Sequence, residues 1–128
     1  MRLLLDTHAF LWWAADDPRL SYVADAAIAG SANSVFISAA TAWEITTKYR
    51  LGKLPGTAIL AANVAAQVAI EGFLELPITV PHAQQAGALQ GRHKDPFDRM
   101  LIAQALVEGL ALVSNEQIFD AYGVTRVW

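Results

Sequence analysis

The sequence predicts a single α/β domain, residues 1–128, in which helices cover both faces of a mainly parallel sheet of four to five strands. The length of 128 residues suits one compact core. The chain is 55% hydrophobic and only 16% charged, which excludes a disordered protein. Short aliphatic runs alternate with longer apolar segments that begin at capping residues, a pattern typical of a sheet covered by helices.

Five short runs have the aliphatic or β-branched composition of buried strands. In chain order they are Leu3–Leu5, Ser34–Ile37, Phe73–Leu76, Leu110–Val113 and Val124–Trp128. A helix signal follows each of the first four, so these strands run in the same direction and their carboxyl ends meet at one edge of the sheet. Folds of this kind form their sites at that edge.

Capping residues and glycines mark the ends of the helices. Ser21, Ser38 and Asp95 are favourable N-caps, and Pro81 suits the first position of another helix. The predicted helices are Ala9–Ala15, Ser21–Ala29, Ser38–Leu51, Ala58–Glu71, Pro81–Gly91, Asp95–Glu108 and Glu116–Tyr122. Between the third and the fourth, residues 53–57 form a loop that contains a proline and a glycine.

Composition also bears on location and partners. No run approaches about 20 apolar residues, so no membrane span is expected, and Asp6 and His8 interrupt the apolar start before a signal-peptide core could form. The absence of cysteine excludes a disulfide framework and a thiolate metal site, and it suits a reducing cytoplasm. A small domain this apolar is expected to bury one face against a partner or a second copy, and the segment Ala58–Glu71 is a candidate for that face.

Acidic residues collect near the carboxyl ends of the predicted strands. Asp6 directly follows the first strand, Glu44 lies in the helix after the second, Asp95 and Asp98 open a later helix, and Glu116 follows another strand. Carboxylates crowded at one edge repel each other unless a cation or a proton intervenes. Oxygen ligands without cysteine favour Mg²⁺ or Mn²⁺, and such ions activate water and stabilise charge on a phosphate.

Each acid also has a purely structural interpretation. Asp6 could cap the next helix. Glu44 and Lys48 form an i,i+4 pair in the favourable orientation. Glu116 could complement a helix dipole in a first turn. Only the joint placement of the acids predicts a site, and that placement depends on the inferred topology.

The stretch HKDPFDRM, residues 93–100, contains two aspartates that differ in position. Asp95 precedes Pro96, which suits the first helical position, so Asp95 stands where an N-cap belongs. Asp98 then falls in the first turn and is expected to point toward the strand ends. This spacing favours Asp98 as the ligand and Asp95 as the cap, with a possible supporting role at the site.

Basic residues add candidates for contact with nucleic acid. The net charge of −3 does not by itself predict such binding, but six of the nine basic residues fall in two short windows near the acids. These residues are Lys48, Arg50, Lys53, Arg92, Lys94 and Arg99. They could contact an RNA backbone, or they could be ordinary solvated charges.

The histidines and tryptophans have mainly structural interpretations. His8 is expected to pack locally on its helix, and His82, just inside a helix that begins with proline, is expected to face solvent. His93 could touch a phosphate. Trp12 and Trp13 could stack on bases, although their apolar neighbours favour a place in the core.

Four segments of the chain carry a family resemblance. They are RLLLDTHAFLWW, ISAATAWEITTKYRLGKL, HKDPFDRMLIAQAL and LVSNEQIFDAYGV. Their content and order resemble PIN-domain ribonucleases, specifically the VapC-type toxins of bacterial toxin–antitoxin pairs, over essentially the whole chain. The resemblance implies an α/β/α fold, an endoribonuclease that depends on Mg²⁺ or Mn²⁺, a homodimer, and inhibition by a VapB-type antitoxin.

The resemblance also implies roles for individual residues. Asp6, followed by the small hydroxyl residue Thr7, and Asp98 match the family's principal metal ligands, and Glu44 matches the acid that completes the site or positions the attacking water. Glu116 stands where the family usually has aspartate; the extra methylene puts direct metal contact in doubt, so it is expected to act through a second ion or a water. Supporting roles are implied for Asp95, Ser114 and Asn115, and RNA contacts for Lys48, Arg50, Arg92, Lys94 and Arg99.

Two other functions compete with this prediction. The first is a phosphatase or phosphotransfer domain with Asp6 as nucleophile, but Asp6-Thr7-His8 lacks the D-x-D arrangement that this chemistry would use. The second is a binding module whose acids are structural or whose activity has decayed, an alternative that Glu116 keeps open.

Overall fold

A five-stranded, entirely parallel sheet forms the centre of the computed structural model, which describes all residues 1–128. Its strands are β1 (Arg2–Leu5), β2 (Ser34–Ser38), β3 (Leu74–Leu76), β4 (Ala111–Val113) and β5 (Arg126–Val127). Their order across the sheet is β3-β2-β1-β4-β5, and every neighbouring pair is parallel. The predicted fold class, with a mainly parallel sheet of four to five strands, is therefore confirmed.

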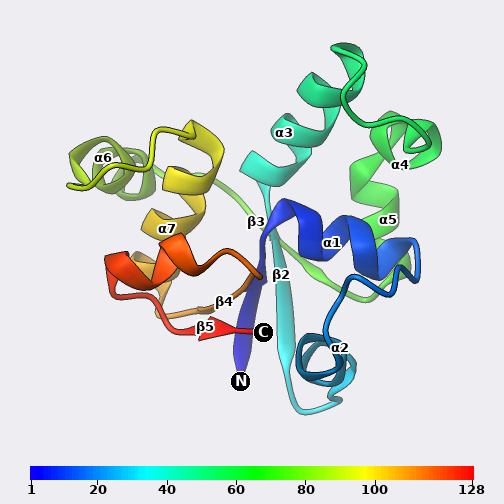
Figure 1. Ribbon diagram of the computed structural model, residues 1–128, viewed down its shortest axis with the longest axis horizontal. Helices are drawn as coiled ribbons and strands as arrows, with labels where there is room; N and C mark the ends of the chain where they lie inside the picture. The colour runs from blue at the N-terminus through cyan, green and yellow to red at the C-terminus, as the bar shows by residue number, and fades with distance from the viewer.

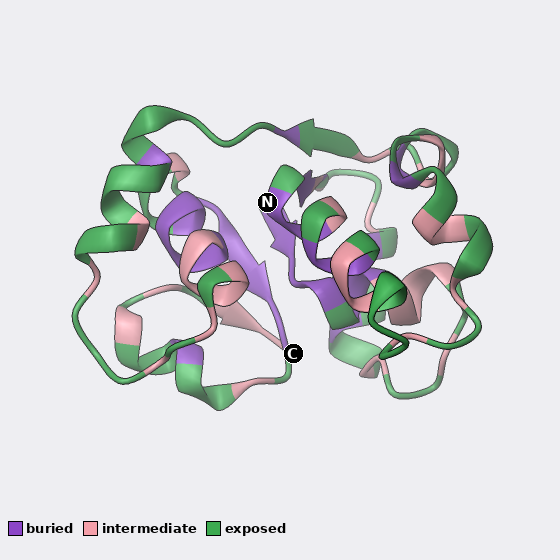
Figure 2. Cartoon of the chain, turned by 90° about the horizontal axis from the view of Figure 1, so that it is seen from above, coloured by how far each residue is buried: buried purple, intermediate pink, exposed green.

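The central strand β1 explains why the sheet needs helices on both faces. Leu3, Leu4 and Leu5 are all fully buried. Because successive side chains of a strand point to opposite faces, Leu3 and Leu5 join one hydrophobic cluster and Leu4 joins another. A run of three consecutive leucines is therefore the signature of a strand buried on both sides. Figure 2 shows the buried residues concentrated in the sheet and on the inner faces of the helices around it.

Two groups of helices cover the two faces, as Figure 1 shows. The helices are α1 (Thr7–Ala14), α2 (Tyr22–Ala29), α3 (Ala39–Arg50), α4 (Ala58–Ala62), α5 (Val64–Ile70), α6 (Val80–Ala88), α7 (Pro96–Glu108) and the 3₁₀ helix η1 (Gln117–Tyr122). Residues of α1, α2, α3 and α5 pack in the cluster that contains Leu3 and Leu5, and residues of α7 and η1 pack in the cluster that contains Leu4. None of these helices combines the length and the apolar character that crossing a membrane requires.

The prediction of one apolar helix over Ala58–Glu71 was wrong. The chain forms two helices, α4 and α5, that meet at Asn63, whose backbone has φ −156° and ψ 81°. The Asn63 side chain accepts a 3.0 Å hydrogen bond from the Ala66 backbone N–H and so caps α5. Asparagine favours caps over helix interiors because its side chain competes for backbone hydrogen bonds. The apolar residues on both sides of Asn63 hid this signal in the sequence.

Several helix ends also differ from the prediction. The first helix begins at Thr7 rather than Ala9, because Asp6 is its N-cap. Helix α6 begins at Val80 under a capping box formed by Thr79 and ends at Ala88, three residues before the predicted stop. The segment predicted as Glu116–Tyr122 is a 3₁₀ helix that starts one residue later.

His82 was predicted to face solvent, and this was wrong, because its side chain is only 1% exposed. The Nδ1 atom accepts a 3.1 Å hydrogen bond from the Thr79 backbone N–H, and Nε2 lies 2.8 Å from the Glu108 carboxylate. The capping box turns the ring back over the start of α6, and α6 packs along α7, which covers it. His82 therefore joins the two helices.

Candidate active site

The order of the strands places Asp6 at a switch point of the sheet. The chain passes from β1 to β2 on one side, whereas β4 pairs with β1 on the other side. Parallel sheets bind ligands beyond the carboxyl ends of strands at such points. Asp6 follows β1 there, and its backbone N–H donates a 3.0 Å hydrogen bond to the carbonyl of Val113 in β4. The buried Asp6 side chain also accepts a 2.8 Å bond from the Ala9 backbone N–H, so the residue caps α1.

Glu44 reaches the same edge from α3 and is held on both sides. Although it lies in the middle of a helix, it is only 3% exposed. The Thr7 hydroxyl donates a 2.5 Å hydrogen bond to Glu44 Oε1, and the ammonium group of Lys48 pairs with Glu44 Oε2. The predicted i,i+4 pair is thus present and lies at the candidate site. Glu44 therefore forms the i,i+4 pair with Lys48 and is also buried at the carboxyl edge of the sheet, where the acidic site was predicted.

Helix α7 contributes the third acid. Asp95 is its N-cap and accepts hydrogen bonds from the backbone N–H groups of Phe97 (2.8 Å) and Asp98 (3.1 Å). Asp98 follows in the first turn, and its Oδ2 atom lies 2.8 Å from Nε2 of His93. The two aspartates of HKDPFDRM thus have different contacts. Asp95 accepts hydrogen bonds from backbone N–H groups, whereas Asp98 meets the His93 side chain.

Glu116 comes from the segment after β4 and meets Asp98. One ligand atom each of His93, Asp98 and Glu116 lie within 4.8 Å of one another. The Glu116 backbone N–H donates a 3.0 Å hydrogen bond to the hydroxyl of Ser114, which fixes the turn between them, while Asn115 is exposed. The predicted acid and the predicted supporting serine are therefore adjacent. His93 was absent from the predicted ligands, because it precedes helix α7 and no recognised metal-ligand spacing marks it.

The pKa values of two acids reflect their burial and their mutual repulsion. Burial raises the pKa of Asp6 to about 6, and the charge of Glu116 adds to that effect. Burial likewise raises the pKa of Asp98 to about 7, with further increases from Asp95, Glu116 and Glu44 and a partial decrease from the hydrogen bond with His93. These charges act on one another only because the topology brings four separate segments together.

Lys48 is the basic side chain that balances part of this charge. Burial lowers the pKa of Lys48, but the hydrogen bond and charge of Glu44, together with Asp95 and Asp98, outweigh burial and raise it above its usual value. One ammonium group cannot neutralise the whole cluster. A half-buried set of oxygen ligands with excess negative charge is a donor set that suits a divalent cation. Carboxylate oxygens of Asp98 and Glu116 lie within 4.8 Å of each other, and Asp6 is near enough for the charge of Glu116 to raise its pKa.

The basic residues predicted to bind RNA fall into two classes. Arg50, Arg92 and Lys94 are exposed, and Lys48 is engaged with Glu44. The RNA contact of Arg99 stays a prediction, and its guanidinium donates to three backbone carbonyl groups. These belong to Ala86 (2.9 Å), Leu89 (2.6 Å) and His93 (3.1 Å). Arginine has a planar fork of donors that suits such a structural role, and the sequence alone could not reveal these acceptors.

Two aromatic rings flank the acids. Trp43 precedes Glu44, Phe97 precedes Asp98, and their rings meet edge to face with centroids 4.8 Å apart. Trp43 is 60% exposed, which is unusual for so large an apolar side chain. The pair borders a cavity of about 250 Å³ that Ile78 also lines. The two rings therefore form an aromatic surface on α3 and α7, the helices that carry Glu44 and Asp98.

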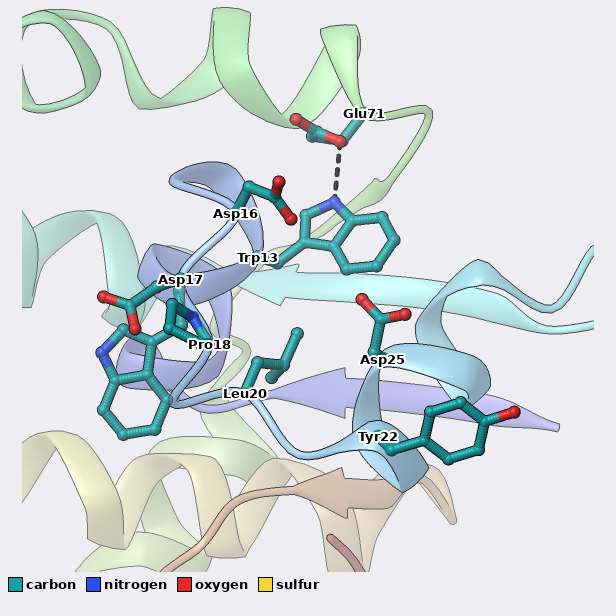
Figure 3. Close-up of a pocket in the computed structure, with 9 residues that line it drawn as sticks. Trp13, Asp16, Asp17, Pro18, Leu20, Tyr22, Asp25 and Glu71 are labelled. Carbon is teal, nitrogen blue, oxygen red and sulfur yellow. Dashed lines mark hydrogen bonds between the residues drawn. The ribbon is translucent and has the colours of Figure 1, made fainter.

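A larger cavity of about 590 Å³ lies elsewhere, between α1, α2 and the end of α5 (Figure 3). Trp12 and Trp13 line it, and the Trp13 indole N–H donates a 2.7 Å hydrogen bond to Glu71. Trp13 also packs against the hydrophobic core, while Trp12 packs on Trp128, with ring centroids 5.9 Å apart. Both tryptophans are half-buried, so the predicted place in the core describes Trp13 better than Trp12.

The sequence and the fold both match known proteins. The sequence model of the PIN domain matches residues 3–124. A chain in the crystal structure of VapBC2 from Rickettsia felis, bound to a DNA fragment from their promoter, superposes with a TM-score of 0.67 and 17% identity, covering 98% of this chain and 97% of that one. A chain of FitAcB from Neisseria gonorrhoeae gives a TM-score of 0.66 and 19% identity, covering 97% and 95%.

A third solved structure, VapBC-1 from nontypeable Haemophilus influenzae, has a TM-score of 0.65 and 16% identity and covers 98% of this chain and 96% of that one. No curated protein matches the sequence. At these identities the solved structures demonstrate a shared fold, and the sequence model demonstrates a shared family. Because that model spans nearly the whole chain, from β1 to the residues after η1, the protein belongs to the PIN domain family.

Proposed function

We propose that this protein is an endoribonuclease that depends on Mg²⁺ or Mn²⁺ and acts in the cytoplasm as the toxin of a VapBC-type toxin–antitoxin pair. The observation that carries the proposal is the convergence of Asp6, Glu44, Asp98 and Glu116 at the switch point of the sheet. Burying several carboxylates that repel each other costs free energy unless a cation compensates their charge. A functional metal site is therefore the best explanation for their presence together.

In this function the acids have distinct roles. Asp6, Asp98 and Glu116 would hold the cation, and a bound cation would lower the pKa of a water molecule and stabilise negative charge on the phosphate. Glu44 cannot move freely, because Thr7 and Lys48 hold its two oxygens, and it orients the attacking water. Lys48 pairs with Glu44 and offsets charge at the scissile phosphate. Ser114 fixes the turn that presents Glu116, and Asn115 is exposed beside it.

The RNA lies across the same edge of the sheet. Arg50, Arg92 and Lys94 are exposed and free to meet phosphates around the acidic centre. Trp43 presents an exposed ring next to Glu44, where an unpaired base can stack. Single-stranded or looped RNA suits this arrangement, because its bases are accessible to a side chain.

A VapB-type antitoxin and a second copy of the chain are the proposed partners. The chain resembles VapC-type toxins in sequence, and two of the solved structures with the same fold are VapBC complexes. Several large apolar side chains are exposed, among them Tyr22 (86%), Ile59 (91%) and Ile70 (75%). Exposed residues of this kind are typical of surfaces that a partner covers.

The alternative of a non-catalytic binding module is favoured by one observation, the glutamate at position 116 where the family usually has aspartate. The proximity of Glu116 to Asp98 argues against it, because the longer side chain still reaches the other acid. A phosphatase with Asp6 as nucleophile has less support, since Asp6 is buried and occupied in capping α1.

Cleavage of RNA by the purified full-length protein tests the proposal. The protein is stripped with a chelator and given end-labelled RNA with or without Mn²⁺ or Mg²⁺. We expect cleavage only with the cation, and a loss of at least about 100-fold in Asp98→Asn, because an amide neither balances the charge nor binds the cation well. Asp25→Asn is the matched control, since Asp25 is an exposed acid of α2. Full cleavage by folded Asp98→Asn, or cleavage without any cation, would contradict the proposal.

A further inference from the structure

We propose that His93 is a direct ligand of the catalytic cation, together with Asp98 and Glu116, and that this imidazole makes the site select Mn²⁺ over Mg²⁺. The inference rests on the proposed function in that it concerns the same cation. It adds a nitrogen ligand to a site for which the sequence predicts only carboxylates.

The positions of the three side chains support a shared ion. His93 Nε2 lies 2.8 Å from Asp98 Oδ2, and one ligand atom from each of His93, Asp98 and Glu116 lies within 4.8 Å of the others. Ligands bound to one octahedral ion at about 2.1–2.2 Å lie roughly 3 Å apart when adjacent and about 4.3 Å apart when opposite. Small side-chain rotations therefore bring all three groups onto one ion. Without a cation, the His93 and Asp98 side chains are hydrogen-bonded to each other. A bound cation would take the place of that hydrogen bond.

The loop around His93 is built to hold the ring in place. The His93 backbone N–H donates a 3.0 Å hydrogen bond to the Tyr122 hydroxyl, and its carbonyl accepts a 3.1 Å bond from Arg99. The ring packs edge to face on Phe119, with centroids 5.9 Å apart. The imidazole is thus fixed from α7 on one side and η1 on the other, so little entropy is lost when it binds an ion.

Gly91 shows that this loop fits closely against Tyr122. Its φ of +114° lies in the region that favours glycine, and a Cβ atom there would come within 2.6 Å of the Tyr122 hydroxyl. Arg99 ties the same loop to the end of α6 through the carbonyl groups of Ala86 and Leu89. The hydrogen bonds that hold this loop come from the His93 backbone and from Arg99, whereas the imidazole nitrogen Nε2 meets Asp98. A ligand role accounts for an imidazole directed at Asp98.

The chemistry of the imidazole gives the expected selectivity. Mg²⁺ prefers oxygen ligands and keeps its hydration water, whereas imidazole nitrogen suits transition-metal ions better. Mn²⁺ accepts both carboxylate oxygen and imidazole nitrogen, and it resembles Mg²⁺ in size and charge. A site in which an imidazole joins the carboxylates therefore binds Mn²⁺ more tightly than a site made of carboxylates alone, with little gain for Mg²⁺.

Pulsed electron paramagnetic resonance of Mn²⁺ bound to the full-length protein tests the inference directly. In the unaltered protein we expect a hyperfine coupling between Mn²⁺ and a nitrogen nucleus. When histidine is labelled with ¹⁵N, the ¹⁴N coupling should be replaced by a ¹⁵N coupling. The coupling should vanish in His93→Gln and persist in His8→Gln. His8 is the matched control, because it is an exposed histidine of α1 that packs on Trp12.

Calorimetric titration gives the second readout, which does not depend on RNA cleavage. We expect His93→Gln to weaken Mn²⁺ binding by about tenfold and Mg²⁺ binding by less than about twofold. Mn²⁺ bound without a histidine coupling, but lost in Asp98→Asn, would overturn the inference and leave the proposed function standing. Equal loss of both ions in His93→Gln would also overturn the selectivity. Absence of Mn²⁺ binding altogether would count against both proposals.

Discussion

The hydroxyl of Thr7 donates a 2.5 Å hydrogen bond to Oε1 of Glu44, across 37 positions of the sequence. Thr7 begins α1 directly after Asp6, and Glu44 lies within α3, so this contact links the two helices that follow the neighbouring strands β1 and β2. Lys48 holds the other oxygen of Glu44. The orientation of Glu44 is therefore set in part by the segment that carries Asp6.

Substitution of Thr7 by valine tests this link, because valine keeps the shape of the side chain and removes the donor. The buried Glu44 oxygen then loses a partner, and we expect the free energy of unfolding to fall by about 1–3 kcal/mol. Urea denaturation measures the change. Thr46→Val is the control, since the Thr46 hydroxyl is exposed and bonds only to carbonyl groups of its own helix, and it should change stability by less than about 0.5 kcal/mol. Equal effects of the two substitutions would refute the role of the link.

The capping role of Asp95 leads to a second prediction. Asp95→Ala should lower the free energy of unfolding by about 1 kcal/mol, because the backbone N–H groups of Phe97 and Asp98 lose their acceptor. Asp95→Asn should leave stability nearly unchanged, since asparagine caps helices about as well as aspartate. Thermal and urea unfolding of the two variants measure the difference. If both variants lose the same stability, the charge of Asp95 rather than its capping bond matters for α7.

The raised pKa values of Asp6 and Asp98 predict that the metal-free protein loses stability as pH rises. Burial and neighbouring charges raise these pKa values to about 6 and about 7 from 3.8, so the folded protein holds protons that the unfolded chain has released. The stabilisation is complete below about pH 4 and is lost as pH rises to about 7. For Asp6 alone the loss between pH 5 and pH 8 is on the order of 1–2 kcal/mol.

Thermal unfolding in the presence of a chelator should therefore show a melting temperature several degrees lower at pH 8 than at pH 5. Mn²⁺ should raise the melting temperature, and more at pH 8 than at pH 5, because the cation competes with protons for the same carboxylates. A cation effect that is independent of pH would argue against these two acids as ligands.

The contrast between Lys94 and Arg99 gives a fourth prediction. Lys94→Gln should weaken RNA binding and reduce the slope of log affinity against log salt by about one. Arg99→Lys keeps the charge but cannot reproduce the bonds to three carbonyl groups, so it should lower stability by more than about 1 kcal/mol and leave the salt slope unchanged. Arg2→Gln is a control for charge, because Arg2 lies at the opposite edge of the sheet. A reduced salt slope in Arg99→Lys would support Arg99 as an RNA contact.

Local signals in the sequence were sufficient for the layered fold and for several caps. Three consecutive leucines predicted β1, because only a strand covered on both faces buries every residue. Ser21, Ser38 and Asp95 were predicted as caps and do cap α2, α3 and α7, since the bond from a cap spans only two or three residues. These features depend on near neighbours, so a single sequence contains the information for them.

Contacts between distant segments were decided by the tertiary structure alone. The sequence predicted His82 to face solvent, but its imidazole is bonded to Glu108 of α7. The sequence likewise gave no sign that Arg99 bonds to three backbone carbonyl groups. The sequence by itself determined the parallel sheet and the capping role of Asp95, whereas the roles of the four acids stay predictions. Only the tertiary structure decided that His93 lies beside Asp98 and Glu116. The strand order brings these segments together, and no local pattern in the sequence predicts the path of the loop that contains His93.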